Sequence, residues 1–280
     1  MFDFSLRAIS SFLIVSIAWW VGGIELYHIL TNFSIEWYWL FFALLYSIVL
    51  NELFCHLIIS HQYFPINTKS ITYKILSFLQ AVDHTTGSAA GFAQVHIVHH
   101  LHPDDKDKDP LYAKTNWLTT NTMSPLLYIY QSPIEIPDEK FFRARWKLNK
   151  DIINDEWTAF CYQYKTSFTL AYWLALYLVL PVILFKIVFL GRLLISIVMA
   201  ICSIGTHKRL LIGMQNVKDK DSTYNNHLFN ILVLGLFPSM LHNNHHNSYT
   251  TKTHSNHWYE LDFGSMIIHY ILRPLLIRRD

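Results

Sequence analysis

Residues 37–61 read WYWLFFALLYSIVLNELFCHLIISH, a run of mostly apolar side chains that ends with two histidines. A helix of roughly 20 residues suffices to cross the hydrocarbon core of a bilayer, which is about 30 Å thick. Residues 37–59 therefore predict a membrane-spanning helix, with His56 and His61 at one of its ends.

Three further apolar runs, at residues 9–30, 167–190 and 193–212, are each long enough to span a membrane as a helix. A short polar turn joins the first of them to residues 37–59, and another short turn separates the last two. Hydrophobic residues make up 52% of the chain, and its mean hydropathy is +0.23. We therefore expect one all-α integral membrane domain over residues 1–280, with four transmembrane helices in two hairpins.

Most Lys and Arg residues lie in two long segments, residues 61–165 and 213–280, whereas the short turns between paired spans carry few. Positive charge marks the cytoplasmic side of a membrane protein. Both segments and both termini are therefore expected in the cytoplasm, where they would form a helical cap. The mixture of apolar and basic residues over 266–279 predicts a helix that lies along the membrane surface.

Composition also excludes some classes of protein. The net charge of +2 argues against a nucleic-acid-binding protein, which needs a concentrated basic face. The three cysteines are far apart, so the sequence contains neither a disulfide framework nor a thiolate zinc site. The unusual residue is histidine, with 16 copies that cluster along the chain.

The histidines form three clusters that read HLIISH, HIVHH and HNNHH. Residues i, i+3 and i+4 share one face of a helix, so each HxxHH motif predicts three imidazoles on one side. His56 and His61 are five residues apart, roughly 140° on a regular helix, and would converge only at a helix end or a local distortion. The clustered histidines are His56, His61, His96, His99, His100, His242, His245 and His246.

Eight converging imidazoles exceed what one metal ion needs, since a catalytic zinc takes three protein ligands. We therefore predict a site for two metal ions. Neutral imidazole binds iron, zinc, copper and nickel, so the ligands alone do not choose the metal. A site just outside the bilayer favours a lipid substrate, and breaking an unactivated C–H bond of a lipid favours iron with oxygen.

In order and spacing, the clusters resemble the three histidine boxes of the membrane fatty acid desaturases of the stearoyl type. In that family the first box is His-x4-His, the second is HRxHH followed by acidic residues and DP, and the third is HNxHH. The corresponding segments here read HLIISH, HIVHHLHPDDKDKDP and HNNHH. Gly87-Ser88 and Phe92 before the second box, and residues 258–262 (WYELD) after the third, also match the bacterial members of the family.

The family has a ninth ligand in an Asn-Ser-x-x-His motif at the end of the fourth span. Residues 203–207 (SIGTH) are the best match, which makes His207 the ninth ligand by resemblance, with Ser203 in place of the family's Asn. His227, in a polar stretch before the third box, is the alternative.

Some positions depart from the family pattern. Ile97 replaces the Arg of the second box, Val95 replaces the Asp before it, and residues 239–241 (SML) replace a common Gly-Glu-Gly. The acidic run after the second box is one residue longer than usual. No ligand is lost, so these changes concern recognition of the substrate more than the chemistry.

The resemblance implies an oxygen-dependent oxidoreductase that inserts a cis double bond into a fatty acyl chain, with two iron ions and O2 as co-substrate. Its partners would be the bilayer, an acyl substrate linked to CoA or to a lipid, and a separate electron donor of the cytochrome or ferredoxin type. Double-bond position, chain length, acyl carrier, donor and oligomeric state stay open.

Other functions are compatible with part of this pattern. A di-iron hydroxylase or ketolase of lipids or carotenoids would share the site. A metal transporter would need ionisable residues along its spans, and only Glu25, Asn51 and Glu52 interrupt them. A zinc hydrolase is disfavoured because the chain has no HExxH motif.

Polar residues beside the boxes could hydrogen-bond to the ligands, or could simply belong to solvated loops and helix caps. These residues are Asp104, Asp105, Asp107, Asp109, Asn243, Asn244 and Asn247.

Overall fold

The computed structural model describes residues 37–83, 93, 96–97, 99–105, 109, 151–152, 154–182, 184–185, 206–207, 213–215, 223–247 and 253–278. The expected span 9–30 and nearly all of the span 193–212 lie outside these residues, as do Asp107 and residues 203–205.

Within the described residues the protein is mostly helical. The helices as far as residue 232 are α2 (Trp37–Ser47), η1 (Ile48–Ser60), α3 (Ile71–Asp83), α7 (Glu156–Gln163), α8 (Lys165–Val179) and α10 (His227–Leu232). Later helices are η2 (Pro238–Met240), α11 (His242–Asn247), α12 (Phe263–Ile267), η3 (Ile268–Leu272) and α13 (Arg273–Leu276). Two short strands, β1 (Gly213–Met214) and β2 (Asn225–Asn226), pair antiparallel.

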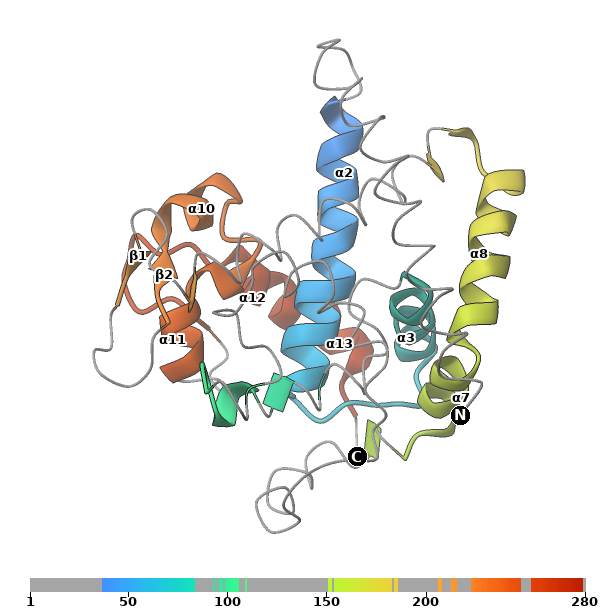
Figure 1. The fold of residues 1–280 in the computed structure, drawn as a ribbon, viewed down its shortest axis with the longest axis horizontal. Coiled ribbons are helices and arrows are strands. Elements are labelled where there is room, and N and C mark those ends of the chain that lie inside the picture. The colour runs from blue at the N-terminus through green and yellow to red at the C-terminus, as the bar shows by residue number, and fades with distance from the viewer. Residues whose placement is uncertain are drawn as a thin grey trace.

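A long helix formed by α2 and η1 runs through the middle of the molecule, with α3, α7 and α8 on one side and α10, α11, β1 and β2 on the other (Figure 1). Its segment Phe41–Ser60 is long and apolar enough to cross a membrane, and it is the one such helix in the described part of the chain. The phenyl rings of Phe41 and Phe42 on α2 are exposed, whereas nearly all of η1 is buried. This helix coincides with the expected span 37–59.

The expected span 167–190 is interrupted before Pro181; residues 182, 184 and 185 beyond it are again helical, and residues 186–190 lie outside the described residues. The helix α8 ends at Val179, and Leu180 adopts an extended conformation before Pro181. A residue that precedes proline is pushed out of the helical region by the proline ring. The arrangement of four spans therefore stays a prediction. Among the described residues, the helix α2–η1 is the one that is long and apolar enough to cross a membrane.

The second half of the long helix has a wide turn. Residues Ile48–Ser60 form a π-helix, in which backbone hydrogen bonds join residues five apart. Positions five apart therefore lie about one turn from each other, so His56 and His61 approach the same face, with ring centroids 5.2 Å apart. A regular α-helix would not bring His56 and His61 to one face, and the π-helix is the departure from it that does so.

The core lies around η1 and joins distant parts of the chain. Phe54 of η1 packs edge-on against Tyr73 of α3, with ring centroids 6.1 Å apart. The C-terminal helices bury Ile268, Leu272 and Leu276 against the same cluster. Because α12, η3 and α13 follow one another without a break, the helix predicted near residues 266–279 is present, while its place at a membrane surface stays a prediction.

The loop after α10 requires a glycine. Gly235 has a φ of +61°, in the left-handed region that favours glycine, and an added Cβ would lie 2.4 Å from the backbone of Leu261. Its carbonyl accepts a hydrogen bond from the N–H of Gly264 at 2.9 Å. This close approach joins the segment before the third histidine box to the start of α12.

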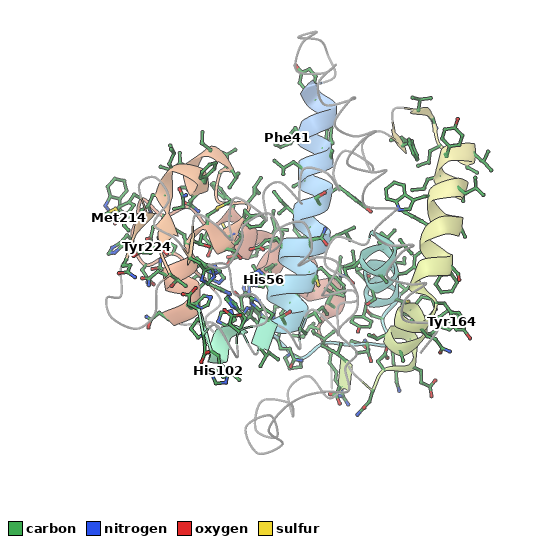
Figure 2. The ribbon with its side chains drawn as sticks, viewed as in Figure 1. Phe41, His56, His102, Tyr164, Met214 and Tyr224 are labelled. Atoms are coloured by element: carbon green, nitrogen blue, oxygen red, sulfur yellow. The ribbon has the colours of Figure 1, made fainter. Side chains whose placement is uncertain are left out.

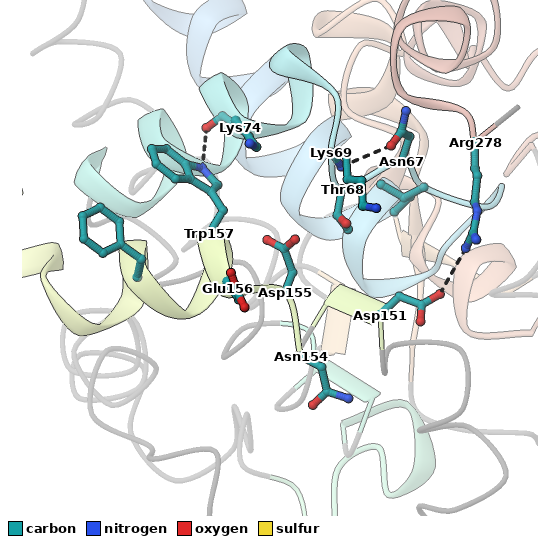
Figure 3. Close-up of a pocket in the computed structure, with 12 residues that line it drawn as sticks. Asn67, Thr68, Lys69, Lys74, Asp151, Asn154, Asp155, Glu156, Trp157 and Arg278 are labelled. Carbon is teal, nitrogen blue, oxygen red and sulfur yellow. Dashed lines mark hydrogen bonds and ion pairs between the residues drawn. The ribbon is translucent and has the colours of Figure 1, made fainter.

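A pocket of about 910 Å³ opens between the starts of α3 and α7 and the C-terminal segment (Figure 3). The indole N–H of Trp157 donates to the carbonyl of Lys74 across it at 2.9 Å. Arg278 and Asp151 form an exposed ion pair at its edge, 4.0 Å apart. Both basic and acidic side chains line the pocket, so the charge of the lining favours neither an anionic nor a cationic ligand.

Candidate metal centre

The structure brings the nine histidines of the three boxes and the SIGTH segment together in two groups, beside the lower end of the long helix (Figure 2). Within each group, one ligand atom from every residue lies within 4.8 Å of those from the others. The five-histidine group consists of His56, His61, His96, His100 and His245. The four-histidine group consists of His99, His207, His242 and His246, all of them buried.

The Nε2 atoms of the five-histidine group point at one another. The Nε2 atom of His96 lies 2.8 Å from that of His56, and 2.9 Å from those of His61 and His100. An imidazole nitrogen carries either one proton or one lone pair, so His96 cannot make three such hydrogen bonds. Two nitrogens bound to one metal ion at about 2.1 Å, at right angles, lie about 3 Å apart. The spacing therefore fits ligands around a metal ion.

The four-histidine group has the same character. The Nε2 atoms of His242 and His207 are 2.9 Å apart, and the ring of His99 lies 4.9 Å from those of His207 and His246. The two groups are adjacent, because the ring of His100 stacks on that of His246 with centroids 4.2 Å apart. Two metal ions held here would be close neighbours.

Each HxxHH motif contributes to both groups. In the second box, the first and last histidines join the five-histidine group, and His99 joins the other. In the third box the division is reversed: His245 joins the five-histidine group, and its two companions join the four-histidine group. Neither box serves one metal ion alone, so the two sites depend on the same helices.

Three buried carboxylates bind the outer nitrogen of a histidine in these groups. Glu52 contacts Nδ1 of His56 at 2.9 Å, and Asp109 contacts Nδ1 of His99 at 2.9 and 3.0 Å. Asp104 contacts Nδ1 of His207 at 3.2 Å. Metal-binding histidines usually donate their second N–H to a carboxylate, which fixes the tautomer and ring orientation. All three contacts engage Nδ1, which makes Nε2 the nitrogen that would bind a metal ion.

The described part of the acidic run after the second box turns at residues 103–104 and brings Asp104 and Asp109 together. Asp104 has a φ of +64°, a conformation that Asp tolerates better than most residues. Its backbone N–H donates to the carboxylate of Asp109 at 2.9 Å, and the N–H of Asp109 donates to the carbonyl of Asp105 at 2.8 Å. The turn thereby places two carboxylates on the four-histidine group.

The asparagines of the third box hold its position. The side chain of Asn244 bonds to Asn225 of β2 at 2.8 Å and to the carboxylate of Glu260 at 3.0 Å. Asn243 contacts the hydroxyl of Thr223 at 3.4 Å. Since the N–H of the next residue, Tyr224, donates to the carbonyl of Thr206 at 2.7 Å, the same network brings the segment of residue 207 beside α11.

The structure separates the two candidates for the ninth ligand. His207 belongs to the four-histidine group. His227, at the start of α10, lies outside both groups, with its ring 5.4 Å from that of Tyr259 and its Nδ1 3.9 Å from Glu260.

Two residues of the site gave no clear signal in the sequence. Glu52 reads as an interruption of an apolar span, although it precedes His56 by four residues and so shares its face in a regular helix. Ser239 reads as a departure from a family pattern. In the structure, its N–H donates to Glu52 at 3.0 Å, and its Oγ lies 3.0 Å from Nδ1 of His56. Together they join η1 to the third box.

The buried imidazoles favour the neutral form that binds metal ions. Burial, reinforced by neighbouring imidazoles, lowers the pKa of His96, His100, His242 and His245 well below the ordinary value. In an unfolded chain the same groups titrate near a pKa of about 6.5. Between these pKa values the unfolded chain binds more protons, so the free energy of unfolding rises with pH there and is constant above.

We predict that the metal-free protein loses stability as the pH falls below about 6.5. At about pH 5.5, each such histidine would cost on the order of 1 kcal/mol relative to neutral pH. Thermal unfolding of the metal-free protein in detergent at about pH 8 and about pH 5.5 measures this. An equal or higher melting temperature at the lower pH would contradict it.

Comparison with protein-family models found no match for this chain, and comparison with curated proteins found no relative. The similarity to the desaturases therefore rests on the motifs, their order and their spacing.

Proposed function

We propose that the protein is a membrane-bound, oxygen-dependent di-iron oxidase that desaturates fatty acyl chains. The observation that carries the proposal is the pair of adjacent histidine groups, nine imidazoles in all, at one end of the apolar helix Phe41–Ser60. The three buried carboxylates on the outer nitrogens support a metal centre, because they orient imidazoles as carboxylates do in known metal sites.

All nine ligands are neutral nitrogen donors, which suit iron and several other transition metals. When bound, two iron ions would supply the reduction of O2 that removes two hydrogens from a lipid. The overall reaction takes an acyl –CH2–CH2– unit, O2, two electrons and two protons, and gives –CH=CH– and two waters. The electrons would come from a separate donor.

The residues of this chain would act by holding the centre in place. Glu52, Asp104 and Asp109 each accept the Nδ1–H of a ligand, so each of those rings presents Nε2 inwards. Burial keeps bulk water away from the reacting atoms, and it lowers the pKa of His96, His100, His242 and His245, which favours their neutral form. Both effects favour a fixed geometry, which the removal of two adjacent hydrogens needs.

Apolar side chains on elements near the site support a lipid substrate. Leu232 of α10 and the residues Tyr270 and Ile271 of η3 are each more than half exposed. Exposed apolar patches mark surfaces for membranes, partners or ligands. A membrane location would give an acyl chain access to the histidine groups from the bilayer.

The test is fatty-acid analysis by mass spectrometry of a host that lacks its own desaturase and expresses this protein. We predict new monounsaturated chains, which also give the double-bond position. The variant His99→Ala should give none, because it removes a ligand of the four-histidine group. The variant His257→Ala, at an exposed histidine outside both groups, should retain the product.

Oxygenated chains in place of unsaturated ones would show a hydroxylase of the same site chemistry. A protein that inserts in the membrane but binds no iron would refute the proposal.

A further inference from the structure

We propose that His254 is a positioning residue of the metal centre, which holds His245 in the tautomer and orientation that bind a metal ion through Nε2. The inference rests on the proposed metal centre. It assigns to an imidazole the part that carboxylates take for three other ligands. His254 belongs to none of the three histidine boxes, and it lies eight residues beyond the last histidine of the third box.

Two buried histidines meet through their ring nitrogens. The Nε2 atom of His254 lies 2.7 Å from Nδ1 of His245, and the ring centroids are 4.8 Å apart. His254 is 1% exposed, so the contact is shielded from water. The hydroxyl of Tyr63, two residues after the first box, lies 3.0 Å from the same Nε2 atom. His254 thus contacts a member of the five-histidine group from outside it.

The proton positions follow from the geometry. The Nε2 atom of His245 faces the five-histidine group, 3.0 Å from Nε2 of His100. If that atom binds a metal ion, the proton of the neutral ring is on Nδ1 and is donated to Nε2 of His254. The proton of His254 is then on its own Nδ1, which faces the carboxylate of Asp262 at 4.0 Å.

Asp262 fixes this histidine to the C-terminal helices. Its carboxylate accepts the backbone N–H of His254 at 2.7 Å and the hydroxyl of Thr253 at 2.9 Å. Its other oxygen accepts the N–H of Ser265 at 3.0 Å and so caps the start of α12. The chain of contacts from His245 through His254 to Asp262 therefore ends on the start of α12.

The role differs from that of a ligand. His254 joins neither histidine group, and its Nε2 atom contacts the outer nitrogen, Nδ1, of His245. Glu52 contacts the same nitrogen of His56, and Asp109 contacts that of His99. Loss of such an outer partner typically weakens metal binding by about 10- to 100-fold. One of the two metal ions should be affected, since the contact reaches the five-histidine group.

The experiment measures metal binding by the full-length protein in detergent micelles, with Fe2+ or Co2+ alone as the probe. For His254→Leu we expect one of the two ions to bind about 10- to 100-fold more weakly, while the other is unchanged. His254→Gln should recover most of that affinity, because its amide oxygen can accept the same hydrogen bond. The ligand-field absorption of bound Co2+ reports the changed site separately from activity.

His257→Leu is the matched control. His257 lies three residues further on in the same loop, is exposed, and stacks on Tyr259 away from the two groups, so both ions should bind as in the wild type. Unchanged affinity for both ions in His254→Leu would overturn the inference. The inference would also be overturned if the Leu and Gln variants both bound both ions equally more weakly and had a lowered melting temperature, because this result indicates a structural role. A wild-type protein that binds no metal would instead refute the proposed function.

Discussion

The variant His96→Ala is expected to bind one metal ion in place of two and to form no product. The Nε2 atom of His96 lies within 2.9 Å of those of three other members of the five-histidine group, so it is at the centre of that group. Its removal takes away a ligand and leaves space that water can enter. Elemental analysis of the purified protein for iron, together with fatty-acid analysis of the host, measures both effects.

The matched control for this variant is His227→Ala. Whereas His96 is buried, His227 is a half-buried histidine that lies outside both groups and contacts Tyr259 and Glu260. It should therefore keep two ions and full product formation. If His227→Ala loses an ion and His96→Ala keeps both, the composition of the two groups is wrong.

The variant Glu52→Leu is expected to lower the free energy of unfolding by about 3–5 kcal/mol, because it breaks a buried charged network. Glu52 is 1% exposed and accepts hydrogen bonds from the N–H and hydroxyl of Ser239, and from Nδ1 of His56. Each buried donor that loses its acceptor costs about 1–3 kcal/mol. Metal binding by the five-histidine group should also weaken by about 10- to 100-fold.

Denaturant unfolding in detergent and metal titration measure these two effects. The variant Glu52→Gln keeps one carbonyl oxygen as acceptor and should lose less stability than Glu52→Leu. Glu156→Gln, at an exposed position at the start of α7, should change neither quantity. A Glu52→Leu protein as stable as the wild type would show that the Ser239–Glu52–His56 network does not hold η1 to the third box.

Eight of the nine histidines of the site could be chosen from the sequence because their spacing carries local information, whereas His207 came from the resemblance, with His227 as its alternative. A motif of the form HxxHH fixes which side chains share a helix face, whatever the rest of the fold does. The five-residue separation of His56 and His61 even indicated that a regular helix would not suffice. The division of each box between two groups was not predictable, because it depends on how α11 and the second box approach each other.

The outer partners of the ligands were only partly predictable. Asp104 and Asp109 stood out as acidic residues after the second box, and the structure selects them through one tight turn. Glu52 and His254 gave little signal, although the ligands that they contact are only 4 and 9 residues away; their contacts with Ser239 and Tyr63 span 187 and 191 residues. Contacts over such separations are set by tertiary packing, which a local pattern does not contain.

The helices were predictable from the apolar runs, except that a proline inside a run ends the helix. The run 37–59 corresponds to a continuous helix because nothing in it breaks the backbone hydrogen bonds. The run 167–190 contains Pro181, and α8 ends just before it. The two runs have similar hydropathy, but only the second contains a residue before proline, Leu180, whose extended backbone conformation ends a helix.

The wide-turned helix η1 also decides how the protein can be handled in the laboratory. It carries His56 and Glu52 on the apolar segment that is long enough to cross a membrane, and His61 follows directly after that segment. A water-soluble fragment made by trimming that segment would therefore lose its metal-binding capacity together with its hydrophobicity. Solubility would have to come from polar replacements at outward-facing positions such as Phe41 and Phe42, which leave the inner face of the helix intact.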